Sequence, residues 1–590
     1  MRRILIVCLL LFTVNMWSQD DIIAKEYFNN GEFNKALLAY QSLLNKQPNN
    51  VNYIAQLVSI YQQLEQYDEA EIFLLQTLER IKYASLWVEL GYNYQLKENF
   101  SLANDNYAKA IAAIDENVNY SYSVGKAFED HSLLEEAATV YKKAMAIKPS
   151  MNFNMQLARI YGEQGDVESM FTSYIDFVEK NPKYLNNIKR AITDFISEDG
   201  SASNNVMLKR ALLKKIQDTP NLMWNEMLSW LFVQQKEYYK AFIQEQAIFN
   251  RQPESLSRVE ELGLIAVNDK SFDIAEDIFT FLVETAQDMD TQLEAQYQLL
   301  QIQEMEDEKL QIVNKTYLGL FNTYGKYPQT IKLQVAYGHF LAFKMHKTSE
   351  AITFLKESLE LPLSEYQQAQ VKLELGDILV FEERFNEALI YYTQIQRNLK
   401  NSTLAQEARY RVAKTSYYKG DFKWAESQLK ILKSSTSQLI ANDALDLMLL
   451  ISDNKFEDST QTALKLYAKA DLMAYQNKPE EAIRILNSVL ENHKTETIMD
   501  QALFKQAQLF KDTEQYQRAA DNYQSIIDNY KDEILADDAF YYLARLYEDQ
   551  LKQPEKAKPL YEEIIFNYED SIYFVEARKR FRALRGDTIN

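Results

Sequence analysis

Apolar residues recur every three or four positions through most of the chain, which is the spacing of amphipathic helices. Residues 85–111 read SLWVELGYNYQLKENFSLANDNYAKAI. They place apolar and small side chains on two helical stripes, at Trp87, Leu90, Gly91 and Tyr94 and then at Ala103, Tyr107 and Ala110. The polar and small residues between the stripes are typical of a short turn. This stretch therefore predicts two helices that pack against each other across a turn.

The second stripe returns many times along the chain. Alanines equivalent to Ala103 occur at Ala36, Ala70, Ala137, Ala241, Ala275, Ala351, Ala388, Ala425, Ala482, Ala519 and Ala557. The spacing between consecutive members is 33 or 34 residues in the first half of the chain and 37 or 38 in the second half, with longer gaps after Ala137, Ala275 and Ala425. A period of this size, with small and aromatic residues at fixed offsets, predicts an array of helix-turn-helix repeats. Each pair must stack on its neighbours, because a single pair cannot bury its own apolar stripe.

The pattern resembles the tetratricopeptide repeat family, whose sequence W-x2-L-G-x2-Y is followed by A-x3-F/Y and a terminal Pro. The fullest match is carried by Trp87, Leu90, Gly91, Tyr94, Ala103 and Tyr107, and partial copies cover most of the chain. The resemblance implies an all-α fold, an α-solenoid of tetratricopeptide-type repeats that forms a superhelix. The offsets fail in residues 184–220, 290–330 and 438–462, where helices are still expected.

The strength of this match divides the chain into five predicted segments. Residues 1–18 are a signal peptide, residues 19–183 an N-terminal repeat array, and residues 184–221 a degenerate helical junction. Residues 222–330 are middle repeats of the same type, and residues 331–590 are a C-terminal array that ends in a capping helix.

The first residues, MRRILIVCLLLFTVNMWSQD, combine two arginines, a short apolar run and a polar exit, which predicts a secretory signal peptide cleaved at Ser18 or Gln19. The apolar run is shorter than the roughly 20 residues that span a bilayer. Cys8 leaves a lipoprotein signal as an alternative, although Val7 is bulky where such signals have a small residue. We expect a protein secreted across the inner membrane, periplasmic or peripherally associated with the outer membrane, with no transmembrane span.

Composition narrows the chemistry further. Cys8 is the only cysteine, so the cleaved chain has no disulfide and no thiolate site. The net charge of −21 repels phosphate backbones and argues against nucleic acid as a partner. The four histidines form no H-E-x-x-H motif, and no nucleophile elbow or phosphate loop occurs. The sequence therefore predicts no enzyme activity, no metal and no cofactor.

The resemblance implies that the first helix of each pair lines a concave groove, through the residues three before and one after its small residue. Aromatic or apolar residues and cations at these places are Tyr122 and Lys126, Met155 and Arg159, Tyr410 and Lys414, and Tyr541 and Arg545, with Tyr92 and Phe504 as partial copies. Residues four apart share a helix face, so each pair offers an aromatic platform beside a cation, which suits an acidic peptide. The alternative is that the cation stems cover neighbouring tyrosines and bind nothing.

These observations predict a non-enzymatic scaffold for protein–protein interaction, which binds peptide segments or domains of other envelope proteins in its groove. The 37-residue period and the signal peptide are similar to those of secreted envelope scaffold proteins of Bacteroidetes-type bacteria. A glycan-binding or peptidoglycan-associated role is the alternative, because the chain contains 39 tyrosines.

Overall fold

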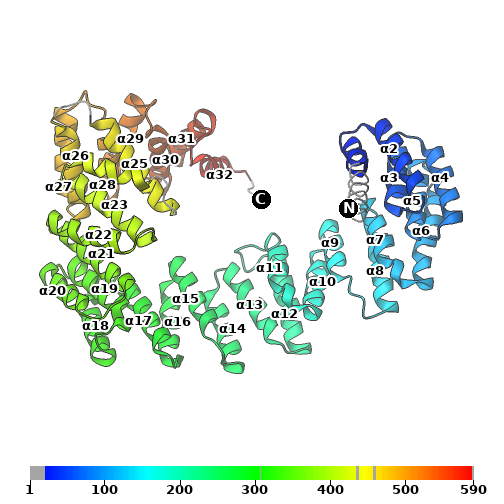
Figure 1. Ribbon diagram of the computed structural model, residues 1–590, viewed down its shortest axis with the longest axis horizontal. Helices are drawn as coiled ribbons and strands as arrows, with labels where there is room; N and C mark the ends of the chain where they lie inside the picture. Colours follow the sequence, from blue (N-terminus) through cyan, green and yellow to red (C-terminus); the bar gives the residue numbers. More distant parts are fainter. Residues whose placement is uncertain (1–19, 306, 433–436, 456–459, 588–590) are drawn as a thin grey trace, which may run out of the picture. The chain divides into compact units, whose positions relative to one another are not determined.

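The computed structural model describes residues 20–305, 307–432, 437–455 and 460–587. These residues form helices joined by short connections, and none of them lies in a β-strand (Figure 1). The predicted all-α fold, an α-solenoid of tetratricopeptide-type repeats, is confirmed. The predicted signal peptide lies outside the described residues.

The chain divides into two compact units, residues 1–278 and residues 279–590, which we call unit 1 and unit 2. This division follows spatial contact, whereas the predicted segment boundaries follow the repeat match, so those boundaries stay predictions. Each unit is described below by itself.

In unit 1, residues 20–29 are helical and are followed by a regular succession of helices. These are α2 (Phe33–Lys46), α3 (Val51–Gln63), α4 (Tyr67–Arg80), α5 (Ser85–Leu96), α6 (Phe100–Glu116), α7 (Ser121–Asp130), α8 (Leu134–Ile147), α9 (Asn154–Gln164), α10 (Val167–Lys180), α11 (Leu185–Thr193), α12 (Ser203–Asp218), α13 (Leu222–Gln234), α14 (Tyr238–Arg251) and α15 (Ser257–Asn268). Helix α16 (Phe272–Thr285) contains the division between the units. Single 3₁₀ turns, Val118–Tyr120 and Pro182–Tyr184, precede α7 and α11.

Unit 2 continues in the same way around a core that runs from Leu293 to Leu546. Its helices are α17 (Met289–Gln303), α18 (Leu310–Tyr324), α19 (Ile331–His339), α20 (Thr348–Leu359), α21 (Glu365–Phe381), α22 (Phe385–Asn398), α23 (Thr403–Tyr418), α24 (Phe422–Leu432), α25 (Gln438–Asn454), α26 (Thr462–Tyr475), α27 (Pro479–Asn492), α28 (Met499–Asp512), α29 (Tyr516–Asn529), α30 (Ala536–Asp549), α31 (Pro554–Asn567) and α32 (Phe574–Arg585). The 3₁₀ turns Asp307–Lys309 and Pro328–Thr330 precede α18 and α19, and α19 continues as a π-helical turn, Phe340–Lys344.

A left-handed residue marks the turn inside almost every helix pair. Residues with positive φ occur five positions before each of the twelve predicted alanines and once more before Met170, at Gly31, Glu65, Glu98, Ser132, Gly165, Lys236, Lys270, His346, Glu383, Gly420, Asn477, Glu514 and Lys552. After Glu98, the Asn99 N–H donates to the Tyr94 carbonyl at 2.9 Å, which ends α5 and reverses the chain. The twelve alanines are at most 1% exposed. The repeat register predicted from the alanines is therefore confirmed.

The helices of a pair approach closely because a small residue on the first faces a tyrosine on the second. A methyl group added to Gly91 would overlap the ring of Tyr107. The same relation, sixteen residues apart, joins Gly125 to Tyr141 and Gly376 to Tyr392. The tyrosine hydroxyl is also anchored on the first helix, as where Tyr107 donates to Gln95 Oε1 at 2.9 Å. These contacts fix how near the two helices of a pair lie.

Helix α25 interrupts the regular pairing in the segment where the repeat offsets fail. It packs on α23 and α24, and the described residues between it and α26 contain no second helix. Helix α26 packs directly on α23, and its end also reaches α21, where the Tyr475 hydroxyl donates to the Asp377 carbonyl at 3.3 Å and Gln476 Nε2 donates to the Phe381 carbonyl at 2.8 Å. The first helix of one pair, α23, therefore packs on the first helix of the next pair, α26, and α25 is an additional helix between the two pairs in sequence.

Gly376→Ala tests the contact between the two helices of a pair. The added methyl group collides with the Tyr392 ring, so we expect a loss of about 1–3 kcal/mol in the free energy of unfolding. Gly319→Ala in α18 is the matched control, because a methyl group there meets no other atom within 4 Å. Helix propensity should make this control more stable by about 0.5–1 kcal/mol. Urea unfolding of the full chain measures both, and effects of the same sign would contradict the contact.

Candidate functional site

A cleft of about 420 Å³ opens between α23, α25, α26 and α28 of unit 2. Among the side chains that line it are Tyr410, Lys414, Asp443, Asp446, Asp471 and Phe504. We call it the Tyr410 cleft. It contains three of the residues predicted for the groove, Tyr410, Lys414 and Phe504.

Asp471 is the electrostatic centre of the Tyr410 cleft. Its two carboxylate oxygens accept from Lys414 Nζ and from Lys505 Nζ, each at 2.7 Å. Burial alone would raise the pKa of Asp471, but the two ammonium groups outweigh it and lower the pKa to about 2. The Lys414 ammonium also lies 5.1 and 5.2 Å from the ring centres of Tyr417 and Tyr418. The predicted groove cation is thus held by this chain's own carboxylate and rings.

The aromatic walls of the cleft are half-buried. Burial, together with the charges of Asp443 and Asp471, raises the pKa of Tyr410 to about 12, so its hydroxyl stays protonated. The ring of Phe504 meets those of Tyr523 and Tyr542 edge to face, with centres 5.6 and 5.7 Å apart. The ring of Phe504 is therefore held by its neighbours, and both Phe504 and Tyr410 line the cleft.

Asp443 and Asp446 lie one helical turn apart on α25 and are exposed toward the cleft. Within the described part of the chain, no cation lies at ion-pair distance from either carboxylate. Partial desolvation and the neighbouring Asp443 charge raise the pKa of Asp446. These two carboxylates add negative charge that the cleft does not balance.

A second cleft of about 420 Å³ lies between α17, α19, α21 and α23. We call it the Asp377 cleft. His339 Nδ1 is 2.9 Å from Glu374 Oε1, and this hydrogen bond raises the pKa of His339. Arg411 is 3.1 Å from Asp377 and 3.2 Å from Glu407. Burial raises the pKa of Asp377 to about 6 in spite of Arg411.

The two clefts are neighbours because α23 contributes to both. Glu407 and Arg411 face the Asp377 cleft, and Tyr410 and Lys414 face the Tyr410 cleft. The π-helical turn directly after His339 adds a residue to α19 at the wall of the Asp377 cleft. Such turns are frequent at functional sites.

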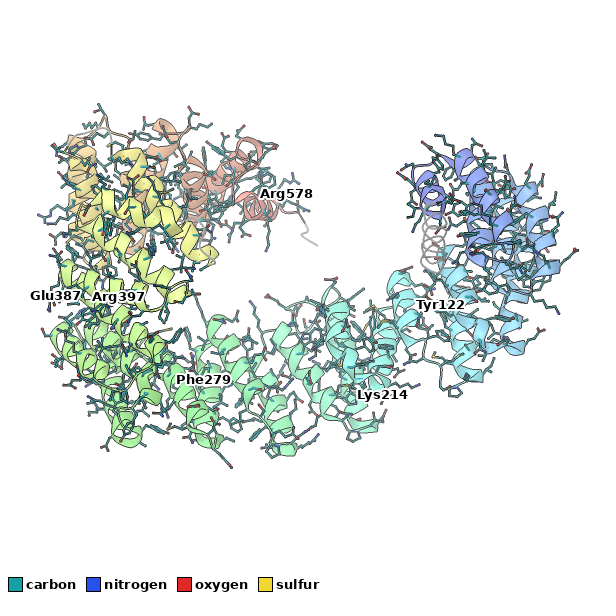
Figure 2. All side chains as sticks on the ribbon, viewed as in Figure 1. Tyr122, Lys214, Phe279, Glu387, Arg397 and Arg578 are labelled. Carbon is teal, nitrogen blue, oxygen red and sulfur yellow. The ribbon has the colours of Figure 1, made fainter. Side chains whose placement is uncertain are left out.

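The remaining predicted groove residue pairs lie elsewhere. In unit 1, Tyr92 stacks on His131, with ring centres 3.9 Å apart, and Lys126 pairs with Asp130 at 2.7 Å. Tyr122 is 57% exposed on α7 (Figure 2), and Arg159 is exposed on α9.

In unit 2, Tyr541 is buried and stacks on Tyr573, with ring centres 4.2 Å apart. Arg545 pairs with Asp549 at 2.6 Å. Neither Tyr541 nor Arg545 lines one of the two clefts. The binding role of all ten predicted residues, Met155 of α9 included, stays a prediction.

Sequence reasoning missed several cleft residues because it searched for a cation beside each aromatic residue. The same offsets around Ala470 of α26 give Tyr467 and Asp471, which line the Tyr410 cleft. Around Gly376 and Gly338 they give Leu373 with Asp377 and Val335 with His339, which line the Asp377 cleft. The positions three before and one after the small residue therefore identify these cleft residues when no cation is required at the second position. Asp443 and Asp446 had no such signal, since α25 lies outside the repeat.

Comparison with known proteins supports the repeat family in the last part of the chain. Residues 501–532 and 538–571, which span α28–α29 and α30–α31, match the tetratricopeptide repeat family. The search of curated proteins found no match.

Two solved structures align over most of their length. A structure of Naa15/Naa10 bound to HypK-THB is 12% identical, covers 97% of this chain and 94% of its own, and has a TM-score of 0.31. The Cut9–Hcn1 hetero-tetramer of APC/C is 13% identical, covers 96% of each chain, and has a TM-score of 0.25. At these TM-scores the whole chains do not superpose, so neither structure bears on the function.

Among the described residues, no group of three or more His, Cys, Asp or Glu side chains is arranged to hold a metal ion. No described helix combines the length and the apolar character needed to cross a bilayer.

Asp471→Asn tests the ion centre through the pH dependence of stability. The pKa of Asp471 is about 2 in the folded chain, below the ordinary value near 4, so its ion pairs stabilise the fold above about pH 4 and lose this effect as the pH falls toward 2. We expect the variant to be less stable by about 2 kcal/mol at pH 7, and the difference from wild type to shrink at pH 3. Urea midpoints measure this.

Asp521→Asn, at an exposed position of α29, is the control and should have a small effect at every pH. A deficit of Asp471→Asn that is the same at pH 7 and pH 3 would contradict the shared ion centre.

Proposed function

We propose that this chain is a non-enzymatic scaffold that binds peptide segments or domains of other proteins in the two clefts of unit 2, and that it acts in the bacterial cell envelope. Tetratricopeptide repeats generally mediate protein–protein interaction, and two segments of unit 2 match that family. The observation that carries the proposal is that two neighbouring clefts are lined largely by the first helices of successive helix pairs. Helix α23 contributes to both clefts.

The side chains that line the clefts are better suited to binding a peptide than to catalysing a reaction. Half-buried aromatic rings such as Tyr410 and Phe504 resemble the anchoring residues of protein interfaces, which supply contact area at low entropic cost. Asp471 is held ionised by two lysines, so it is a poor proton donor or acceptor near neutral pH. Asp377 has a pKa of about 6, but its carboxylate already accepts from the Tyr392 hydroxyl at 2.6 Å and is paired with Arg411 at 3.1 Å.

No observation specifically favours the glycan-binding alternative. Many tyrosines lie in the core of the helix pairs, as do Tyr107, Tyr141 and Tyr392, and cannot stack on a sugar. The envelope location rests on residues 1–18 and on the similarity of the 37-residue period to that of envelope scaffolds.

Site-specific photo-crosslinking tests the cleft as the binding surface. We expect p-benzoylphenylalanine in place of Tyr410 to capture a protein partner in cells. Trp424 is the matched control, because it is 51% exposed on α24 of the same helix pair but does not line the Tyr410 cleft. The same replacement at Trp424 should capture no partner. The same product from both positions, or a glycan product from Tyr410, would contradict the proposal.

The mature mass and location of the protein test the envelope assignment. We expect the intact mass of a chain that begins near Gln19 and carries no acyl group, recovered with the periplasm or, after gentle lysis, with the outer membrane. A chain that retains residues 1–18 in the cytoplasm, or one that begins at an acylated cysteine, would overturn this part of the proposal.

A further inference from the structure

We infer that the partner segment held in the clefts of unit 2 is basic, and that its lysine or arginine side chains lie against the rings of Tyr410 and Phe504 and beside the carboxylates of Asp443 and Asp446. The inference rests on the proposed scaffold function and adds the chemistry of the partner.

The lysines of the Tyr410 cleft are already satisfied inside the chain. Lys414 and Lys505 share the carboxylate of Asp471 at 2.7 Å each, and Asp471 is largely buried. An acidic partner would have to compete with this carboxylate for both ammonium groups. The reason for expecting an acidic partner from the sequence, a free cation beside an aromatic platform, does not hold for Lys414.

The balance of charge in the Tyr410 cleft is negative. Two lysines face three carboxylates, because Asp443 and Asp446 line the cleft in addition to Asp471. Outside the cleft lining, Asp538 of α30 accepts from the Tyr573 hydroxyl at 2.7 Å, and burial together with the charges of Asp537 and Asp446 raises the pKa of Asp538. A cationic side chain entering the cleft would therefore gain attraction without displacing an internal ion pair.

The Asp377 cleft does not have this excess. Glu374, Asp377 and Glu407 line it, but Arg411 is paired with Asp377 and Glu407, and His339 Nδ1 lies 2.9 Å from Glu374. Lys332 also lines the cleft, but its ammonium lies 2.6 Å from Glu294. Among the described residues that line the two clefts, the carboxylates that are left without a cation are therefore those of Asp443 and Asp446 in the Tyr410 cleft.

The aromatic rings that line the clefts offer a second favourable contact to a cationic side chain of the partner. The lysines of these clefts already lie against rings, because Lys332 Nζ is 4.1 Å from the ring centre of Tyr297 and Lys414 Nζ is 5.1 Å from that of the buried Tyr417. Tyr410 and Phe504 offer further ring surface beside the unbalanced carboxylates. A guanidinium or ammonium group gains from both the ring and the carboxylate, whereas an acidic or apolar side chain gains from at most one.

Binding of three labelled peptides to the full chain tests the inference. The probes are fluorescein-labelled peptides of one length and frame that carry lysines, glutamines or glutamates at the same positions, and fluorescence anisotropy gives each Kd. We expect the lysine peptide to bind at least about 10-fold more tightly than the glutamine peptide and the glutamate peptide to bind most weakly. Asp443→Asn with Asp446→Asn should weaken the lysine peptide by about 3- to 10-fold and leave the helical circular dichroism unchanged.

A matched variant separates the cleft from the general negative charge of the chain. Asp521→Asn with Asp528→Asn removes the same charge from the exposed side of α29 and should change the Kd less than 2-fold. Equal weakening by both double variants would overturn the inference, as would binding of the glutamine or glutamate peptide as tight as that of the lysine peptide. The photo-crosslink at Tyr410 is independent of peptide charge. A protein captured there without preference for the lysine peptide refutes the basic partner alone, and no capture refutes the scaffold function itself.

Discussion

The close contact between a small residue on one helix and a tyrosine on the next is the constraint on which the rest of the structure depends. At Gly376 the first helix has no side chain, so the two helices approach until the ring of Tyr392 on the second helix lies against the backbone of the first. The pairs that contain Gly91, Gly125 and Gly376 repeat this contact at the same offset of sixteen residues, which gives them the same geometry. The first helices then stand in a row, and residues at one offset of each helix become neighbours on a common surface.

The clefts of unit 2 follow from this row. Positions three before and one after the small residue come together from successive helices, which brings Tyr410 and Lys414 of α23 to Asp471 of α26. Burial in such a surface makes an unpaired charge costly, so the chain pairs its lysines with its own carboxylates. The carboxylates without a cation, Asp443 and Asp446 on the additional helix α25, determine which charge on a partner is attracted to the cleft.

The fold and its register could be predicted from the sequence because they depend on local spacing. Each of the twelve alanines marks one repeat, and each glycine–tyrosine contact joins residues of the same repeat. The cleft could be predicted only in part. Lys414 and Asp471 are 57 residues apart, farther than one repeat, because α25 is inserted between their helix pairs. Neither that ion pair nor the place of Asp443 follows from a repeat offset.

A double-mutant cycle between Gly376→Ala and Tyr392→Leu tests the central constraint most directly. If the added methyl group destabilises the pair by colliding with the ring, then shortening the ring to leucine relieves the collision. The free energy of unfolding lost by the double variant should then be smaller than the sum of the two single losses by about 1 kcal/mol or more. Losses that add within about 0.3 kcal/mol would show that the two residues do not constrain each other, and would contradict the account.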